Sequence, residues 1–330
     1  MRTLVLGATS LIGNNVLRAA IDAGWETVVL EQASPRRAAL EGLEAEIIAG
    51  NPDEPDALVS AMRGCETLFH TAGYSPPNRL HHLRRLAQAR QHIGRVLRAA
   101  QEARITRLVY TSSTSTIGRP DTPSSLPDEW NRYRLGQALH PYWDAKLVQE
   151  EAVLAFGRES GIPVVILNAS EAVGPFDFDL VASQPLLEMA RRGSRRYMPG
   201  RISVADARDM AQGHIMAAQH GRAGERYIVA GHNITRQEMT AVMAFACKRP
   251  PPDRPVNMHR FERWTRFSER LSCLGRRDRP FPLGYLVAAV RLGGWYASGK
   301  ARAELGYTNR PLINSFRTTL SWLQEMSFLR

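Results

Sequence analysis

The feature that most constrains this chain is a short apolar run that leads into a glycine-rich turn at its N-terminus. Residues 3–6 read TLVL, the composition of a buried strand, and residues 7–13 read GATSLIG. An apolar-periodic segment follows through Ala23 and predicts a helix. A strand, a glycine turn and a helix in this order are typical of a unit that binds a dinucleotide. The start of the chain therefore predicts an α/β fold.

The glycines of this turn have separate uses. Gly7 permits a tight turn, Gly13 lets the helix pack closely on the strand, and the N–H groups at the helix start can hold a pyrophosphate. Ser10 stands where this pattern commonly has glycine, so its hydroxyl could bond a phosphate or its bulk could displace the cofactor slightly. The residues of the turn that we expect to contact the cofactor are Gly7, Thr9, Ser10, Leu11, Ile12 and Gly13.

An acidic residue ends the second predicted strand, residues 27–30. The carboxylate of Glu31 could accept hydrogen bonds from the adenosine ribose and repel a 2′-phosphate, which favours NAD over NADP. Two alternatives stay open, because Arg36 and Arg37 could fold back onto such a phosphate and Glu31 could simply end the strand in solvent. We expect NAD as the cofactor, with NADP as the alternative.

Small and polar residues follow the third and fourth predicted strands, 46–49 and 67–70. Asn51 is placed to touch adenine, and the small residues after the fourth strand suit close approach of the cofactor. The residues that we expect to contact the cofactor here are Asn51, Pro52, Thr71, Ala72 and Gly73.

A long helix predicted near 79–103 carries three histidines among many arginines and glutamines. We interpret them as a solvated face, since no carboxylate or cysteine joins them, and we expect no metal site. These histidines are His81, His82 and His92.

Hydroxyl and phenol groups occur further along the chain. A fifth strand, 107–110, runs into six Ser or Thr residues at the carboxyl end, where parallel sheets bind ligands. Tyr142 and Lys146 are four residues apart, so a helix that starts at Pro141 places both on one face. A lysine cation would lower the phenol pKa from its usual value of about 10, so that Tyr142 could exchange a proton with an alcohol or ketone.

The alternation of strands and helices continues to a sixth strand at 163–168. This order predicts an α/β fold with a doubly wound, parallel Rossmann sheet. We expect a dinucleotide-binding domain over residues 1–170, to which 203–230 returns, and a smaller C-terminal substrate-binding lobe over 171–330.

Composition and charge narrow the classes of function. The net charge of +11 leaves open a basic surface, an anionic ligand or contact with an anionic membrane face. The basic residues are spread out and no recognition motif accompanies them, so we expect no nucleic-acid partner. Three widely spaced cysteines, no signal-peptide pattern and no long apolar run favour a cytoplasmic protein, with surface membrane association as the alternative.

Several further motifs occur in a fixed order. They lie at residues 7–13, 50–52, 70–73, 108–113, 142–146, 174–175, 203–211, 224–228 and 298–307. Together they resemble the extended short-chain dehydrogenase/reductase family, also called the NAD-dependent epimerase/dehydratase family. Residues 168–175, NASEAVGP, are most similar to a branch of that family. This branch contains dihydroflavonol-reductase-like proteins, hopanoid-associated sugar epimerases and 3β-hydroxysteroid dehydrogenase-like proteins.

The resemblance implies roles for three residues. Ser113 would bind the substrate oxygen, Tyr142 would act as acid and base, and Lys146 would lower the Tyr142 pKa and bind the nicotinamide ribose. Ser112 or Thr114 could replace Ser113, because the register in a run of hydroxyls is open. The resemblance also implies a homodimer formed by the long helix and the Tyr142 helix. The cofactor contacts that it adds are Asn168, Ala169 and Ser170.

The alternating pattern weakens beyond residue 176, where we expect a lid over the reacting end of the cofactor. Arg195, Arg196 and Arg208 could clamp an anionic group such as a diphosphate, or could face solvent. Glu171 could orient a substrate hydroxyl or bond a backbone N–H. The apolar run at 281–290 could lie on a membrane surface or pack on the lobe.

These features together predict an NAD(P)-dependent oxidoreductase that interconverts a secondary alcohol and a ketone, with a steroid-like, terpenoid-like or lipid-linked small molecule as substrate. A first alternative is a redox-neutral, NAD-dependent epimerase of a nucleotide sugar. A second is a non-catalytic regulator that binds the cofactor. The complete set of Ser, Tyr and Lys argues against the regulator, because a pure binding protein does not need it.

Overall fold

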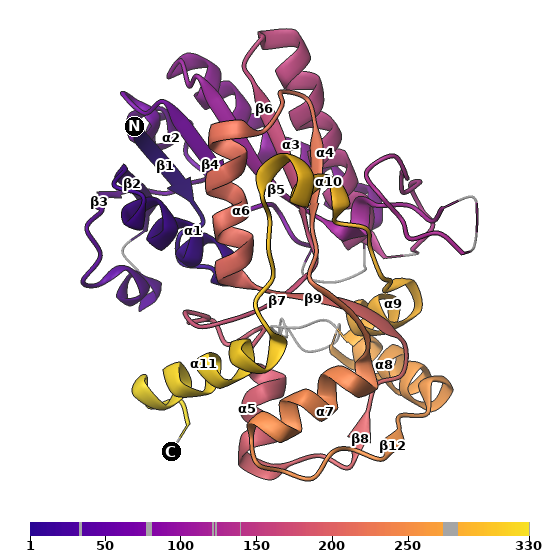
Figure 1. Ribbon diagram of the computed structural model, residues 1–330. Helices are drawn as coiled ribbons and strands as arrows, with labels where there is room; N and C mark the ends of the chain where they lie inside the picture. The colour runs from indigo at the N-terminus through magenta and orange to yellow at the C-terminus, as the bar shows by residue number, and fades with distance from the viewer. Residues whose placement is uncertain are drawn as a thin grey trace.

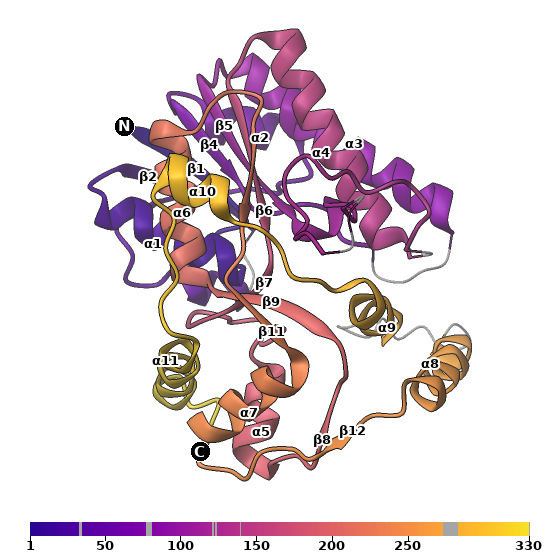
Figure 2. The ribbon, with the colours of Figure 1, turned by 45° about the vertical axis from the view of Figure 1, so that its right-hand side comes forward.

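A computed structural model gives the fold of residues 1–32, 35–76, 81–120, 122, 124–138, 140–272 and 283–329, without side chains at 35–37, 266–272 and 283–285. A large sheet carries helices on both faces, and a smaller lobe lies beyond the carboxyl ends of its central strands (Figure 1). The N-terminus lies at the far end of the sheet from this lobe, and the C-terminus lies in the lobe (Figures 1 and 2).

Seven parallel strands form the large sheet in the order β10-β6-β5-β4-β1-β2-β3. The strand order reverses between β1 and β4, which is where such sheets open a crevice for a ligand. The predicted doubly wound parallel sheet is therefore confirmed. The strands are β1 (Arg2–Leu6), β2 (Glu26–Glu31), β3 (Glu46–Ala49), β4 (Thr67–His70), β5 (Arg107–Ser113), β6 (Val164–Ala169) and β10 (Arg226–Val229).

Two apolar layers hold helices against the sheet, because successive side chains of a strand point to opposite faces. Val5 and Val109 belong to the core under α1, α6 and α10, whereas Leu4 and Leu108 belong to the core under α2, α3 and α4. All four side chains are fully buried. The helices are α1 (Leu11–Asp22), α2 (Pro55–Met62), α3 (His82–Glu102), α4 (Pro141–Ser160), α6 (Ala207–His220) and α10 (Gly299–Leu305).

The smaller lobe combines a three-stranded sheet with several helices. Its strands run in the order β11-β9-β7, with β9 parallel to β7 and antiparallel to β11. Leu186, Met243 and Trp322 bring α5, α7 and α11 into one core. The elements of this lobe are β7 (Glu171–Val173), α5 (Gln184–Arg192), β8 (Arg196–Tyr197), β9 (Arg201–Asp206), β11 (His232–Thr235), α7 (Arg236–Ala246), β12 (Arg254–Pro255), α8 (Met258–Ser272), α9 (Leu283–Leu292) and α11 (Leu312–Glu325).

The segment 203–230 is shared between the two sheets. Strand β9 lies in the three-stranded sheet, whereas β10 pairs with β6 at the edge of the large sheet and α6 packs on α1. The assignment of 1–170 and 171–330 to two domains stays a prediction.

Helix α9 contains most of the apolar run predicted at 281–290, of which residues 281 and 282 lie outside the described ranges. Its Ala288 and Ala289 are buried in a cluster with Trp143 and Leu147 of α4. The apolar face of this helix is thus turned toward the protein. Within the described ranges, no helix is both long and apolar enough to cross a bilayer.

The three histidines near the start of α3 do not share one environment. His81 is exposed, as predicted, but His82 Nε2 lies 3.0 Å from Oδ2 of the buried Asp144. His92 is partly buried, with its ring centroid 6.0 Å from that of His70. The prediction of a solvated face is therefore wrong for His82 and His92. A carboxylate does join one of them, although the described residues hold no group of three potential metal ligands.

Candidate active site

A cleft of about 190 Å³ opens where the carboxyl ends of the central strands meet the smaller lobe. The residues that line it come from the ends of β4, β5 and β6 and the first two turns of α4 on one side, and from β9, α7, α9 and the segment after α9 on the other. The side chains on which the following argument depends all line this cleft: Ser113, Tyr142, Lys146, Ser203, Arg236 and Tyr296.

The glycine turn brings α1 close to the ends of β1 and β4. Gly7 has a φ of 88°, and a Cβ atom there would lie 2.7 Å from Thr71 Oγ1. A Cβ atom on Gly13 would lie 2.0 Å from the Gly7 carbonyl oxygen. Both positions therefore require glycine, one for its conformation and one for close packing.

Ser10 stabilises the turn itself. Its hydroxyl donates to the Gly7 carbonyl oxygen at 2.8 Å and accepts from the Gly13 N–H at 3.2 Å, so it caps α1. The N–H groups of Leu11 and Ile12 begin the helix and have no acceptor inside it. The serine at this position thus has a local structural use that sequence reasoning did not consider.

The ends of β2 and β3 are joined by polar side chains. Thr9 Oγ1 donates to Glu31 Oε2 at 3.1 Å, and Gln32 Nε2 donates to Asn51 Oδ1 at 2.7 Å. Glu31 is half-buried and held by Thr9, so it does more than end a strand in solvent. Pro52 follows Asn51 in the turn after β3. The side chains of residues 36 and 37, the predicted alternative for a 2′-phosphate, lie outside the described residues.

The end of β4 lies beside the candidate catalytic lysine. The Thr71 hydroxyl donates to the Leu6 carbonyl oxygen at 2.7 Å, which ties this segment to β1. After Ala72, a Cβ atom on Gly73 would lie only 3.0 Å from Lys146 Nζ. The absence of a side chain at this position therefore leaves room for the ammonium group, while the predicted contact of residue 73 with the cofactor stays a prediction.

Tyr142 and Lys146 lie on one face of α4, one turn apart. Pro141 is the first helical residue, and Nδ1 of His140 accepts a hydrogen bond from the Tyr142 N–H at 3.2 Å. Lys146 Nζ lies 5.7 Å from the centroid of the Tyr142 ring. Burial lowers the pKa of Lys146 to about 8, because the charged form loses hydration. A cation this poorly solvated beside a phenol favours the phenolate.

The structure narrows the choice among the three candidate hydroxyls. Ser112 is buried, and its Oγ donates to Glu150 Oε2 at 2.5 Å. Thr114 also lines the cleft but is buried, at 8% exposed. Ser113 is partly exposed to the cleft, where its Oγ accepts from the Ser115 N–H at 3.1 Å and keeps its own proton to donate. This geometry favours Ser113.

A buried carboxylate that sequence reasoning missed lies behind these hydroxyls. Glu150 is fully buried, and its Oε1 lies 2.8 Å from Nε of Arg226. Its Oε2 accepts from Thr116 at 2.7 Å and from Asn168 Nδ2 at 2.8 Å. The side chain of Asn168 is therefore used in this network, whereas Ala169 and Ser170 line the cleft. The available signal was the spacing, since Glu150 follows Lys146 by one helical turn.

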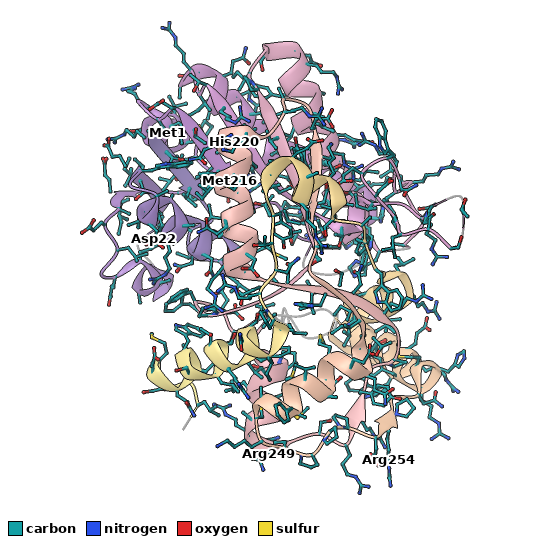
Figure 3. The ribbon with its side chains drawn as sticks, viewed as in Figure 1. Met1, Asp22, Met216, His220, Arg249 and Arg254 are labelled. Carbon is teal, nitrogen blue, oxygen red and sulfur yellow. The ribbon has the colours of Figure 1, made fainter. Side chains whose placement is uncertain are left out.

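The three arginines predicted as an anion clamp do not come together at the cleft. Arg208 is paired with Asp206 at 2.7 Å, and Arg195 lies 4.0 Å from Asp253. Arg196 pairs in register with Arg254, which Figure 3 places at the far end of the smaller lobe. Of the two alternatives, the structure favours solvent-facing side chains for Arg195 and Arg196, and it pairs Arg208 with a carboxylate of its own. A different arginine, Arg236, lines the cleft.

Comparison with known proteins agrees with this geometry. Residues 3–230 match the family described as "NAD dependent epimerase/dehydratase family". The chain belongs to the NAD-dependent epimerase/dehydratase family. Its members are NAD(P)-dependent enzymes of the extended short-chain dehydrogenase/reductase type, so the predicted family and enzyme class are confirmed.

Relatives within the family are distant. The chain is 28% identical to a putative dihydroflavonol 4-reductase of Synechocystis sp., over 99% of this chain and 95% of that protein. It is 25% identical to sterol demethylase protein B of Methylococcus capsulatus, over all of both chains. Identities this low leave the substrate undetermined.

Solved structures share the fold along the whole chain. A nucleoside-diphosphate-sugar epimerase from Pseudomonas aeruginosa superposes with a TM-score of 0.81 at 24% identity, covering 100% of this chain and 99% of the other. A dTDP-glucose 4,6-dehydratase from Streptomyces venezuelae, solved with NAD bound, gives 0.73 at 20% identity over 100% and 99%. These matches establish the architecture.

Proposed function

We propose that this protein is an NAD-dependent oxidoreductase that interconverts a secondary alcohol and a ketone. The observation that carries the proposal is the convergence of Ser113, Tyr142 and the buried Lys146 on one cleft at the carboxyl ends of the parallel strands. A hydroxyl donor, a phenol and a cation that stabilises the phenolate are the groups that proton transfer to a carbonyl oxygen requires.

The described residues fit a dinucleotide along the ends of the strands. The pyrophosphate would lie on the glycine turn against the N–H groups of Leu11 and Ile12 at the start of α1. Glu31, held by Thr9, would accept hydrogen bonds from the adenosine ribose and disfavour a 2′-phosphate, which supports NAD. Lys146 beside Gly73 would bind the nicotinamide ribose. When bound, the nicotinamide ring would accept or supply the hydride.

Each catalytic side chain then has one role. The Ser113 hydroxyl donates a hydrogen bond to the substrate oxygen and holds it beside Tyr142. In alcohol oxidation the Tyr142 phenolate takes the hydroxyl proton, and in ketone reduction the phenol returns it. The Lys146 ammonium group, 5.7 Å from the centroid of the Tyr142 ring, would stabilise the phenolate that forms in this step.

Apolar side chains support a hydrophobic substrate body. Ile202, Ala289 and Leu292 line the lobe side of the cleft, and Trp143 lines the α4 side. The names of two relatives, sterol demethylase protein B and 3 beta-hydroxysteroid dehydrogenase/Delta 5-->4-isomerase, are consistent with a ring-shaped alcohol or ketone. We infer an alicyclic substrate whose reacting carbon reaches Ser113.

Two measurements test this function. Titration with NADH and NADPH should show tighter binding of NADH. Glu31→Gln should bring the two affinities closer together, whereas the exposed Glu41→Gln should leave their ratio unchanged. On any ketone that the protein reduces, Tyr142→Phe should lower kcat by about 10²–10⁴-fold. The matched Tyr197→Phe on β8 should keep it. Unchanged turnover by Tyr142→Phe would refute the proposed proton transfer.

A further inference from the structure

The cleft contains a buried cation that the proposed reaction does not use. Arg236 is 7% exposed, lines the cleft and is the first residue of α7. The lobe-side wall to which it belongs lies opposite Tyr142 and Lys146 of α4. A buried guanidinium stays charged and needs hydrogen-bond or ion-pair partners, so the partners of Arg236 indicate its role.

Arg236 has few partners within the protein. Its Nη2 donates to the Ala289 carbonyl oxygen at 3.5 Å, the upper limit for a hydrogen bond. That carbonyl already accepts from the Gly293 N–H at 2.8 Å. Buried Nε of Arg236 has no acceptor, and no ion pair joins Arg236 to a carboxylate anywhere in the described part of the chain. A buried charge left this way destabilises the fold.

An arginine at the first position of α7 does not stabilise the helix. The N-terminal end of a helix carries partial positive charge and favours anions. The cap is complete without Arg236, since the Thr235 hydroxyl accepts from the Glu238 N–H at 3.1 Å and Glu238 Oε2 accepts from the Thr235 N–H at 2.7 Å. The guanidinium therefore adds to a positive end that a ligand could neutralise.

A second polar group without a partner lies on the same wall. Ser203 of β9 is 3% exposed, and its Oγ has no hydrogen-bond partner among the described residues. It faces the cleft and pairs in register with Asn233, three residues before Arg236. One cation and one hydroxyl, both buried and unsatisfied, point to a single anionic group of a ligand.

We propose that Arg236, with Ser203, binds a carboxylate of the substrate, so that the protein acts on a hydroxy or oxo acid. This rests on the proposed oxidoreductase function, in which the reacting carbon lies at Tyr142. Arg236 and Lys146 are the basic side chains among the described residues lining the cleft, and Lys146 serves Tyr142. One arginine matches one carboxylate in bidentate geometry, whereas a nucleoside diphosphate would need more positive charge.

Three probes of matched shape test the site without turnover. They are cyclohexanecarboxylate, its methyl ester and cyclohexyl phosphate, and their binding to the NAD-loaded full chain is followed by tryptophan fluorescence, since Trp143 lines the cleft. The carboxylate should bind at least about tenfold more tightly than the ester. Equal binding of acid and ester would overturn the proposal. Tighter binding of the phosphate would keep the anion site and assign it to a phosphate ester.

Variants separate ligand binding from a structural use of Arg236. Arg236→Gln should remove the preference for the acid over the ester. Arg236→Lys should keep part of this preference, because lysine keeps the positive charge but cannot form the two parallel hydrogen bonds of a guanidinium. Arg195→Gln, an exposed arginine away from the cleft, should leave the preference intact. An Arg236→Gln protein that keeps the full preference would refute the assignment. Because binding is measured directly, the result stands apart from any failure of the proposed redox reaction.

Discussion

Two arginines ten residues apart, Arg226 and Arg236, are both buried and have opposite surroundings. Arg226 lies 2.8 Å from Glu150 and also donates to the carbonyl oxygens of Glu129 and Thr116, at 3.0 and 3.2 Å. Arg236 has one long hydrogen bond to a carbonyl oxygen that is already occupied. The charge of Arg226 is neutralised by a carboxylate of the protein, whereas the charge of Arg236 has no such partner among the described residues.

This difference separates two uses of a buried cation. Around Glu150 and Arg226, donors from β5, β6 and β10 meet one carboxylate, which fixes the strand end that presents Ser113. Around Arg236 the protein leaves donors unsatisfied beside an open cleft. A satisfied cluster stabilises a structure, whereas an unsatisfied one stores free energy that a ligand can recover.

Breaking the satisfied cluster should have the largest effect. Glu150→Gln keeps most hydrogen bonds but leaves Arg226 as an unpaired buried charge, so it should lower the free energy of unfolding by about 3–5 kcal/mol. Urea denaturation followed by circular dichroism measures this. The exposed neighbour Glu151→Gln should change it by less than about 0.5 kcal/mol. Equal stability of the two variants would show that the cluster is energetically unimportant.

Lys146, the third buried cation, should have a smaller and pH-dependent effect. Its folded pKa of about 8 lies below the unfolded value, so between pH 8 and about 10.5 the unfolded chain binds more protons and stability rises with pH. Lys146→Met lacks this penalty and should be up to about 3 kcal/mol more stable than the parent at pH 7, with the gap closing by pH 10.5. Unfolding curves at several pH values, with the exposed Lys248→Met as control, measure the gap. A constant gap would contradict the assigned burial cost.

Arg236→Gln should have the smallest effect on stability. Removing a buried cation that has no counter-charge should raise the free energy of unfolding, by less than about 1 kcal/mol because the hydrogen bond to Ala289 is lost as well. Arg226→Gln should lower the free energy of unfolding by several times the change expected for Arg236→Gln, because it leaves Glu150 as a buried carboxylate without its arginine. Thermal unfolding of the two variants compares them directly. A large loss for Arg236→Gln would mean that its bond to Ala289 holds α9 in place.

The large sheet was predictable because its signals are local. Apolar runs such as residues 3–6, the glycine turn and the helical spacing of Tyr142 and Lys146 each depend on neighbours in the chain, and the order of strands follows from their alternation with helices. The contacts of Ser10 with Gly7 and Gly13 lie within one turn, yet comparison with the dinucleotide pattern suggests only a phosphate contact or a displaced cofactor for this serine, because that pattern commonly has glycine there.

The wall opposite α4 was not predictable in the same way. Arg236 reaches the cleft only because β9, β11 and α9 come together, and no spacing in the sequence links residues 203, 236 and 289. Arg195 and Arg208 carry charge that the sequence cannot pair, but each lies near a carboxylate once the chain folds. The sequence shows which arginines could bind an anionic ligand, but only the folded protein shows which of them are already paired with a carboxylate.

The capping of α7 has a consequence for how substrates could be exchanged over evolutionary time. Thr235 and Glu238 begin this helix by themselves, so the side chain between them can vary without rebuilding the lobe. If Arg236 binds a substrate carboxylate as proposed, a single codon change at position 236 would redirect the protein from acids to neutral or cationic molecules while Ser113, Tyr142 and Lys146 stay as they are. Position 236 would then determine which substrates bind without taking part in proton transfer, so it is a suitable site for engineering substrate specificity.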